Sequence, residues 1–216
     1  MALHSRNWDV IGLIAALLGP GMVALLSNAI ATDPETIGPR LLGLALFAGL
    51  FLFVLWIALR REALNAQQLG FGDPNFWSPV LALLLSVFFI FAFGPIAYMV
   101  VDWLQLGSFD ETINRLAALP KWYLLLSVVL VAGIEEWFYR GYAIERLAAI
   151  TGSYWLAGGI SLTVFAIVHL PLWGVGPALT TVVSGGILTV LYVLRRDVLM
   201  LILAHIATDL YGIVLN

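Results

Sequence analysis

Long uninterrupted apolar runs are the feature that most limits how this 216-residue chain can fold. A helix of about 20 apolar residues crosses the ~30 Å hydrocarbon core of a bilayer. Seven runs approach or reach this length: Val10–Ala31, Leu41–Leu59, Pro79–Val101, Trp122–Gly141, Trp155–Leu170, Gly176–Leu194 and Val198–Leu215. Because the runs are continuous and do not alternate, they predict helices and not strands. The sequence therefore predicts an all-α, polytopic membrane helical bundle of about seven transmembrane helices, forming one membrane domain over residues 1–216.

The amino-acid composition also indicates a chain embedded in lipid, and it excludes several functions. Hydrophobic residues make up 62% of the chain and charged residues 11%, whereas soluble domains are nearer one half and one quarter. The net charge of −3 gives no reason to expect a nucleic-acid partner. The chain has no cysteine, which excludes a disulfide framework, a thiolate nucleophile and a thiolate metal site.

Local signals suggest where two helices deviate or end. Pro171 cannot continue a helix, so the fifth run is expected to stop at Leu170. The first helix is expected to kink at Gly19-Pro20-Gly21. In the sixth run, Ser184-Gly185-Gly186 permits a close approach of helices, and its simplest interpretation is tight packing.

The Lys and Arg residues between the runs predict the orientation in the membrane. With the N-terminus inside, the inner segments carry seven of them and the outer segments three. The inner set is Arg6, Arg60, Arg61, Arg140, Arg146, Arg195 and Arg196, and the outer set is Arg40, Arg115 and Lys121. The prediction is therefore an N-in bundle.

Ionisable side chains within membrane spans are costly, and they usually face a cavity or a partner. Six of them stand out, all in the C-terminal half: Glu135, Glu136, Arg140, His169, His205 and Asp209. They come from the fourth, fifth and seventh runs, so three helices each contribute.

Spacing sorts these residues further. Glu136 and Arg140 are four apart and are expected to form an ion pair. Glu135 is rotated by ~100° from Glu136, which leaves it available for another partner. Simpler interpretations remain for each group: Glu135 as a carboxylate at a helix end, His169 bonded to a backbone carbonyl, and His205–Asp209 as a helix-stabilising pair.

Three motifs carry a family resemblance. EEWFYR has the form EExxxR, FAIVH the form FxxxH and HIATD the form HxxxD, in that order along the chain. This set resembles the CPBP intramembrane proteases, the CAAX-processing and bacteriocin-processing (Abi) group that includes the type II CAAX prenyl endopeptidases. The resemblance covers residues 121–216 as a CPBP-like core, while residues 1–120 are not diagnostic. The family's third motif often ends in Asn, where this chain has Asp209.

The resemblance implies roles for these residues, and we favour a mechanism without a metal. Glu135 would be the general base that activates water, and His169 would hold the same water or help to orient Glu135. His205 would donate to the developing oxyanion, and Asp209 would fix its tautomer. Glu136, Arg140 and Phe165 would support these groups. The same side chains suit zinc as well, with Glu135, His169, His205 and Asp209 as ligands; no HExxH helix is present to favour that alternative.

The predicted depths of Glu135, His169 and His205 in the membrane differ, which is a difficulty for placing all three in one site. Counted from predicted span ends at 1.5 Å per residue, Glu135 lies ~9 Å deep, His205 ~12 Å and His169 ~21 Å. Either the fifth span begins below the interface or the fourth is longer and tilted. If the depths agree, the expected site is an inward-facing cavity open to the cytoplasm.

The resemblance leaves other functions open. A non-catalytic immunity or scaffold protein with the same fold would use the six polar residues as a buried network. A small transporter or proton relay is disfavoured, because there is no internal repeat and few polar groups in the first three spans. The expected partners are the lipid bilayer and a peptide or membrane-protein substrate, with no nucleic acid. The expected location is the cell (inner) membrane.

Overall fold

The computed structural model describes residues 2–30, 36–72, 75–107, 116 and 118–215, and for residues 2–6 it describes the backbone alone. Seven helical segments of this part of the chain are long and apolar enough to cross a membrane: Asn7–Ile30, Ile37–Arg61, Trp77–Trp103, Lys121–Thr151, Tyr154–Trp173, Val175–Arg195 and Val198–Leu215. The described residues form no strand. The predicted all-α bundle of seven membrane helices is therefore confirmed.

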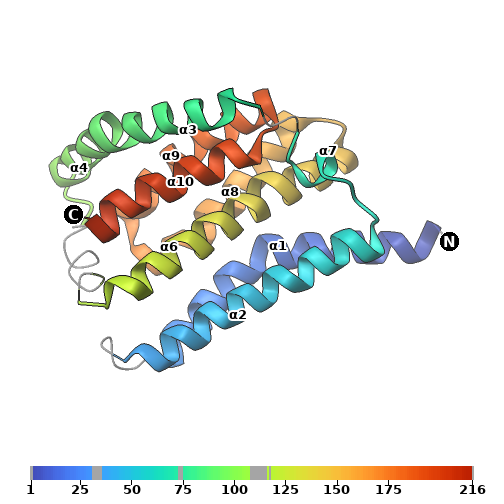
Figure 1. The fold of residues 1–216 in the computed structure, drawn as a ribbon, viewed down its shortest axis with the longest axis horizontal. Coiled ribbons are helices and arrows are strands. Elements are labelled where there is room, and N and C mark those ends of the chain that lie inside the picture. The colour runs from blue at the N-terminus through green and yellow to red at the C-terminus, as the bar shows by residue number, and fades with distance from the viewer. Residues whose placement is uncertain (1, 31–35, 73–74, 108–115, 117, 216) are drawn as a thin grey trace.

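The helices form a hairpin packed on a larger bundle (Figure 1). The hairpin is α1 (Ala2–Ile30) and α2 (Ile37–Trp56), which continues as the π-helix η1 (Ile57–Arg61). The third span is α3 (Trp77–Phe88), η3 (Phe89–Phe93) and α4 (Gly94–Trp103). The fourth is α6 (Lys121–Glu136), η4 (Trp137–Tyr142) and α7 (Ala143–Thr151). The last three are α8 (Tyr154–Trp173), α9 (Val175–Arg195), and α10 (Val198–Asp209) with η5 (Leu210–Leu215).

Two predicted helix ends were wrong. α8 continues through Pro171 to Trp173 and ends at Gly174, whose positive φ of 79° takes the backbone out of the helix. Pro171 lies in the last turn, so it removes one hydrogen bond there without stopping the helix. The fourth span continues past Gly141 to Thr151, where Gly152 ends it with a φ of 73°. α1 runs through Pro20 as one helix, and the kink expected there stays a prediction.

Buried polar contacts close the end of the bundle that holds the N-terminus. The carboxylate of Glu145 on α7 accepts from the Tyr192 hydroxyl at 2.8 Å and from Arg196 Nε at 2.8 Å. The backbone N–H of Val198 donates to the carbonyl of Gly70 at 3.0 Å. A Cβ on Gly70 would lie 2.4 Å from the Cα of Gly141, so the loop before α3 packs directly on η4. These contacts fix α7, the α9–α10 turn and η4 relative to one another.

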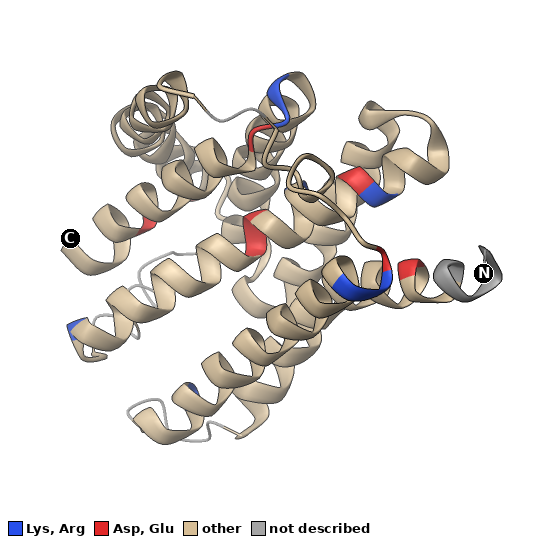
Figure 2. Ribbon diagram, turned by 45° about the vertical axis from the view of Figure 1, so that its right-hand side comes forward, with Lys and Arg blue, Asp and Glu red and all other residues tan. Residues whose placement is uncertain are grey.

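The two ends of the bundle differ in charge. Figure 1 places the N- and C-termini at opposite ends, and Figure 2 shows most of the charged residues towards the end with the N-terminus. Three of the seven cations that predicted the N-in orientation are paired inside the fold: Arg140 with Glu136, Arg146 with Glu62 and Arg196 with Glu145. Their positions follow from packing as well as from topology. The N-in orientation therefore stays a prediction.

Candidate active site

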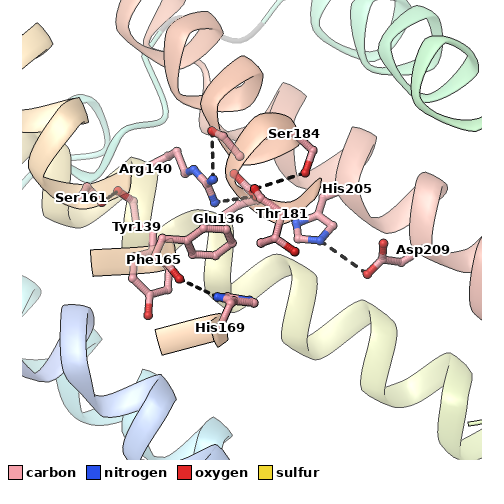
Figure 3. Close-up of polar contacts among 11 residues, drawn as sticks. Glu136, Tyr139, Arg140, Ser161, Phe165, His169, Thr181, Ser184, His205 and Asp209 are labelled. Carbon is pink, nitrogen blue, oxygen red and sulfur yellow. Dashed lines mark hydrogen bonds and ion pairs between the residues drawn. The ribbon is translucent and has the colours of Figure 1, made fainter. Parts of the chain in front are cut away.

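Three helices bring their polar side chains to one cavity of about 610 Å³. α6 contributes Glu135 and Glu136, α8 contributes His169, and α10 contributes His205 and Asp209. Figure 3 shows both histidines and Asp209 near the buried Glu136 and Arg140. The four residues proposed from sequence as catalytic thus line the same cavity.

The longer fourth span accounts for the apparent difference in depth. Gly141 and Val198 lie at the same level, because the loop at Gly70 contacts both. Glu135 lies six residues before Gly141 and His205 seven after Val198, which is ~9 Å and ~10 Å along the two helices. α8 begins beyond this level because it follows α7, so His169 needs more residues to reach the cavity. Of the two alternatives, a longer fourth span is the one observed.

Glu136 and Arg140 form the ion pair that their spacing predicted. Arg140 Nη1 lies 3.0 Å from Glu136 Oε1, and both side chains are almost fully buried. Arg140 also donates from Nη2 to the carbonyl of Gly185 on α9 at 3.2 Å. Its guanidinium lies over the ring of Phe165, 4.3 Å from the centroid, in a cation–π contact. Neighbouring groups on three helices therefore hold the buried cation.

His205 lies between two carboxylates. Its Nδ1 is 2.9 Å from Glu136 Oε1, and its Nε2 is 3.5 Å from Asp209 Oδ2. Both nitrogens can donate only when the ring is an imidazolium, so this arrangement suits a protonated ring. The contact between Glu136 and His205 was not predicted, because the two residues are 69 positions apart and lie on different helices.

His169 has one ring nitrogen committed to its own helix. Nδ1 is 2.7 Å from the backbone carbonyl of Phe165, and a carbonyl can only accept. Nδ1 therefore carries the hydrogen, and in the neutral ring Nε2 keeps a lone pair. The backbone bond that the simpler interpretation foresaw is present, and it also fixes a tautomer able to accept from a water molecule.

Glu135 is half-buried and makes no hydrogen bond or ion pair with the residues that the structure describes. Its strongest electrostatic neighbours are His169 and His205. It lines the 610 Å³ cavity and a second, adjoining one of about 760 Å³ between α1, α2 and α6. Its carboxylate thus remains available at the junction of the two cavities.

The cavities reach the end of the bundle opposite the N-terminus. Both are lined by Arg40 in the first turn of α2, Tyr123 in the first turn of α6 and Trp173 at the end of α8. Tyr139 and Arg140, which also line the 610 Å³ cavity, are fully buried, and so is the adjacent Phe138. A cytoplasmic opening and an N-in orientation, both expected from sequence, are therefore incompatible: with N-in, the cavities extend towards the outer side.

Two supporting residues escaped the sequence analysis. Gly185 accepts the hydrogen bond from Arg140, although its small-residue motif indicated only tight packing. Ser161 donates to the carbonyl of Tyr139 at 2.6 Å and so ties α8 to η4. The spacing of Gly158, Ser161 and Phe165 along one face of α8 was the available signal, but it also fits ordinary helix packing.

The described residues hold no close group of metal-ligating side chains. Among the described residues, no three His, Cys, Asp or Glu side chains converge closely enough to hold a metal ion. His205 directs its nitrogens at Glu136 and Asp209, and His169 Nδ1 faces a backbone carbonyl. The zinc ligands considered from sequence are thus near one another without forming a coordination group.

A comparison with protein families adds an independent observation. A family model described as type II CAAX prenyl endopeptidase Rce1-like matches residues 117–211. This segment is Rce1-like. The match confirms the resemblance drawn from the three motifs, and the Rce1-like segment contains every residue of α6, α8 and α10 that lines the 610 Å³ cavity. No curated protein and no solved structure matches the chain.

The Rce1-like segment and the apolar helices support one general description. The chain is an integral membrane protein, and the similarity of residues 117–211 to the Rce1-like family supports a CAAX-type intramembrane endopeptidase. A peptide substrate within a bilayer fits both observations.

Proposed function

We propose that this protein is an intramembrane endopeptidase in which Glu135 is the general base. The observation that supports this most is the contrast between the adjacent acids. Glu136 is buried and occupied by Arg140 and His205. Glu135 faces the cavity beside two histidines and has no bonded partner among the described residues. A carboxylate in that position can take a proton from water.

In the proposed reaction, Glu135 and the lone pair on His169 Nε2 hold one water molecule. The water oxygen attacks the scissile carbonyl carbon, and Glu135 takes the proton that is released. The new C–O bond makes a tetrahedral oxyanion, to which His205 donates a hydrogen bond. His205 Nε2 is the available donor, because its 3.5 Å contact with Asp209 is the longer of its two. Collapse breaks the C–N bond, and Glu135 passes its proton to the leaving amine.

The proposed substrate is a peptide or a segment of a membrane protein. The cavities of about 610 and 760 Å³ leave room for several side chains around Glu135. The 760 Å³ cavity is lined mainly by apolar residues of the α1–α2 hairpin and α6, which suits an apolar sequence next to the cleaved bond. We place the protein in the cell (inner) membrane, with the bilayer as its other partner and without a nucleic-acid partner.

Comparative proteomics of cells carrying wild type or Glu135→Gln tests this function. Mass spectrometry of protein N-termini should find at least one new terminus with wild type that is absent with Glu135→Gln. Asp102→Asn, an exposed carboxylate at the end of α4, is the matched control and should keep that terminus. If every cleavage persists in Glu135→Gln cells, the protease proposal is wrong and the non-catalytic immunity or scaffold alternative is favoured.

The reaction is proposed to need no metal. Purified protein should cleave the identified substrate equally with and without a chelator, and metal analysis should find no stoichiometric zinc. Cleavage that stops on chelation and returns with added zinc would instead establish the metal-dependent alternative.

A further inference from the structure

Arg140 is the point where the contacts of both histidines meet. Through Glu136 Oε1, 3.0 Å away, it connects to His205 Nδ1, which lies 2.9 Å from the same oxygen. Through Phe165, whose ring it covers at 4.3 Å, it connects to His169, whose ring centroid is 4.2 Å from that of Phe165. A displacement of this one buried guanidinium would therefore move the surroundings of both imidazoles.

Gly185 on α9 sets the position of Arg140 in two ways. Its carbonyl accepts from Arg140 Nη2 at 3.2 Å. It also has no side chain where one would collide: a Cβ would lie 2.9 Å from Arg140 Nη2 and 3.1 Å from Phe165 Cε1. Neither neighbour can move away freely, because both side chains are packed in the core and Arg140 is bonded on two sides.

We propose that Gly185 is a positioning residue that orients His169 and His205 through Arg140. The sixth span carries none of the catalytic candidates, so this gives α9 a role in the site. The inference about ring orientation stands on geometry alone, and its effect on cleavage rests on the proposed function.

The chain supplies a matched control in the next residue. A Cβ on Gly186 would meet Leu162 Cδ2 at 3.7 Å, an ordinary contact, and would meet neither Arg140 nor Phe165. Gly185→Ala and Gly186→Ala each replace one glycine of α9 with alanine, and both gain the same helix propensity. A difference between them reports the local contact.

Histidine NMR tests the proposal without a substrate. The protein has three histidines, His4, His169 and His205, so ring-labelled histidine in detergent-solubilised protein gives few signals to assign. Gly185→Ala should shift the ring signals of both His169 and His205, and Gly186→Ala should leave both in place. A folded Gly185→Ala protein with unchanged His169 and His205 signals overturns the proposal.

A second variant covers the case in which Gly185→Ala does not fold. Arg140→Lys keeps a cation for Glu136 but is too short and too narrow to keep the Gly185 contact and the guanidinium stack on Phe165. It should shift both ring signals as well, and unchanged rings would overturn the proposal.

Kinetics separate this inference from the proposed function. On the substrate identified by proteomics, Gly185→Ala should lower kcat by about 10²-fold with KM nearly unchanged, as expected for misplaced groups. If Glu135→Gln stops cleavage while Gly185→Ala behaves like Gly186→Ala, only the positioning role fails. If the NMR shifts appear but cleavage does not depend on Glu135, only the proposed function fails.

Discussion

Glu135 and Glu136 are neighbours in sequence but lie in different surroundings. Glu136 is completely buried and shares one oxygen between Arg140 and His205, while its Oε2 has no partner among the described residues. Glu135 is half-buried on the cavity wall. The rotation of ~100° between adjacent helix positions is enough to give one acid a structural environment and the other a free carboxylate.

The two acids should differ in their effect on stability. Glu136→Gln leaves Arg140 as a buried cation without its counter-ion, which typically costs about 3–5 kcal/mol. Glu135→Gln removes a charge that has no ion pair with a described residue, so it should cost much less. Thermal unfolding of the purified variants in detergent checks this. Equal losses for the two variants would contradict the assigned ion pair.

The sequence predicted contacts within one helix more successfully than contacts between helices. The Glu136–Arg140 pair followed from a spacing of four residues, and the structure confirms it. The Glu136–His205 bond and the Gly185 carbonyl under Arg140 depend on how α6, α9 and α10 pack, which spacing along the chain does not encode. The roles of Glu135, His169, His205 and Asp209 stay predictions, although the structure places all four on one cavity.

At the scale of whole elements, a π-helical segment directly follows α6, which carries Glu135 and Glu136, and another directly follows α10, which carries His205 and Asp209. η4 begins after Glu136, and η5 begins after Asp209. Such segments are frequent at functional sites, because the wider turn changes which residues face inward. The span count could be predicted from hydropathy alone. The π-segments and the extension of the fourth span to Thr151 could not, because all of these residues remain helical and locally compatible with an α-helix.

The α1–α2 hairpin forms one wall of both cavities, with Ala24 lining each of them. Ala24→Phe should fill that space and raise KM while changing kcat little, since it removes room for substrate and leaves Glu135 in place. Leu25→Phe is the control, because Leu25 is 51% exposed on the outer face of the same helix. Steady-state kinetics on the identified substrate distinguishes them, and an unchanged KM in Ala24→Phe would exclude this wall from substrate binding.

Glu62 ties the end of the second span to the fourth. It accepts a hydrogen bond from Tyr142 and lies 3.4 Å from Arg146, with Asp9 nearby. Burial raises the pKa of Glu62 above its ordinary value of 4.5, against the opposing effects of Tyr142 and Arg146. The folded protein therefore binds this proton more tightly than the unfolded chain does, and stability falls as the pH rises through the raised pKa.

Glu62→Gln should remove this contribution. The thermal unfolding temperature of wild type relative to Glu62→Gln should fall as the pH rises above the ordinary carboxyl pKa of 4.5. Parallel unfolding curves in detergent at several pH values measure that difference. A difference that stays constant or grows with pH would show that Glu62 is held in its charged form.

At the scale of the whole molecule, the orientation in the membrane decides which compartment supplies the substrate. Three of the seven cations on the predicted inner side, Arg140, Arg146 and Arg196, are paired inside the fold, so their positions are weak indicators of topology. The N-in prediction therefore rests on the other Lys and Arg residues. If it is right, the cavities extend towards the outer face, where Arg40 and Trp173 line them.

The absence of cysteine allows a clean test of orientation. Ala66 and Ala118 are exposed alanines near opposite ends of the bundle, so Ala66→Cys and Ala118→Cys form a matched pair. With the N-terminus inside, a membrane-impermeant maleimide should label Ala118→Cys in intact cells and Ala66→Cys only after lysis. The reverse labelling would establish an N-out protein whose cavities extend towards the cytoplasm.

The wide turn of η4, Trp137–Tyr142, has a consequence for how such chains can change in length. A π-turn amounts to one additional residue accommodated within an α-helix. Deleting a single codon there would restore an ordinary helix and leave the residues that follow at nearly their present angle, whereas the same deletion in an α-helical part of the span would rotate them by ~100° relative to the residues before it. A rotation of that size would turn Glu145 away from Tyr192 and Arg196. η4 is therefore the part of the fourth span where the loss of one residue would leave Glu135 and Glu136 in register with the contacts that hold α7.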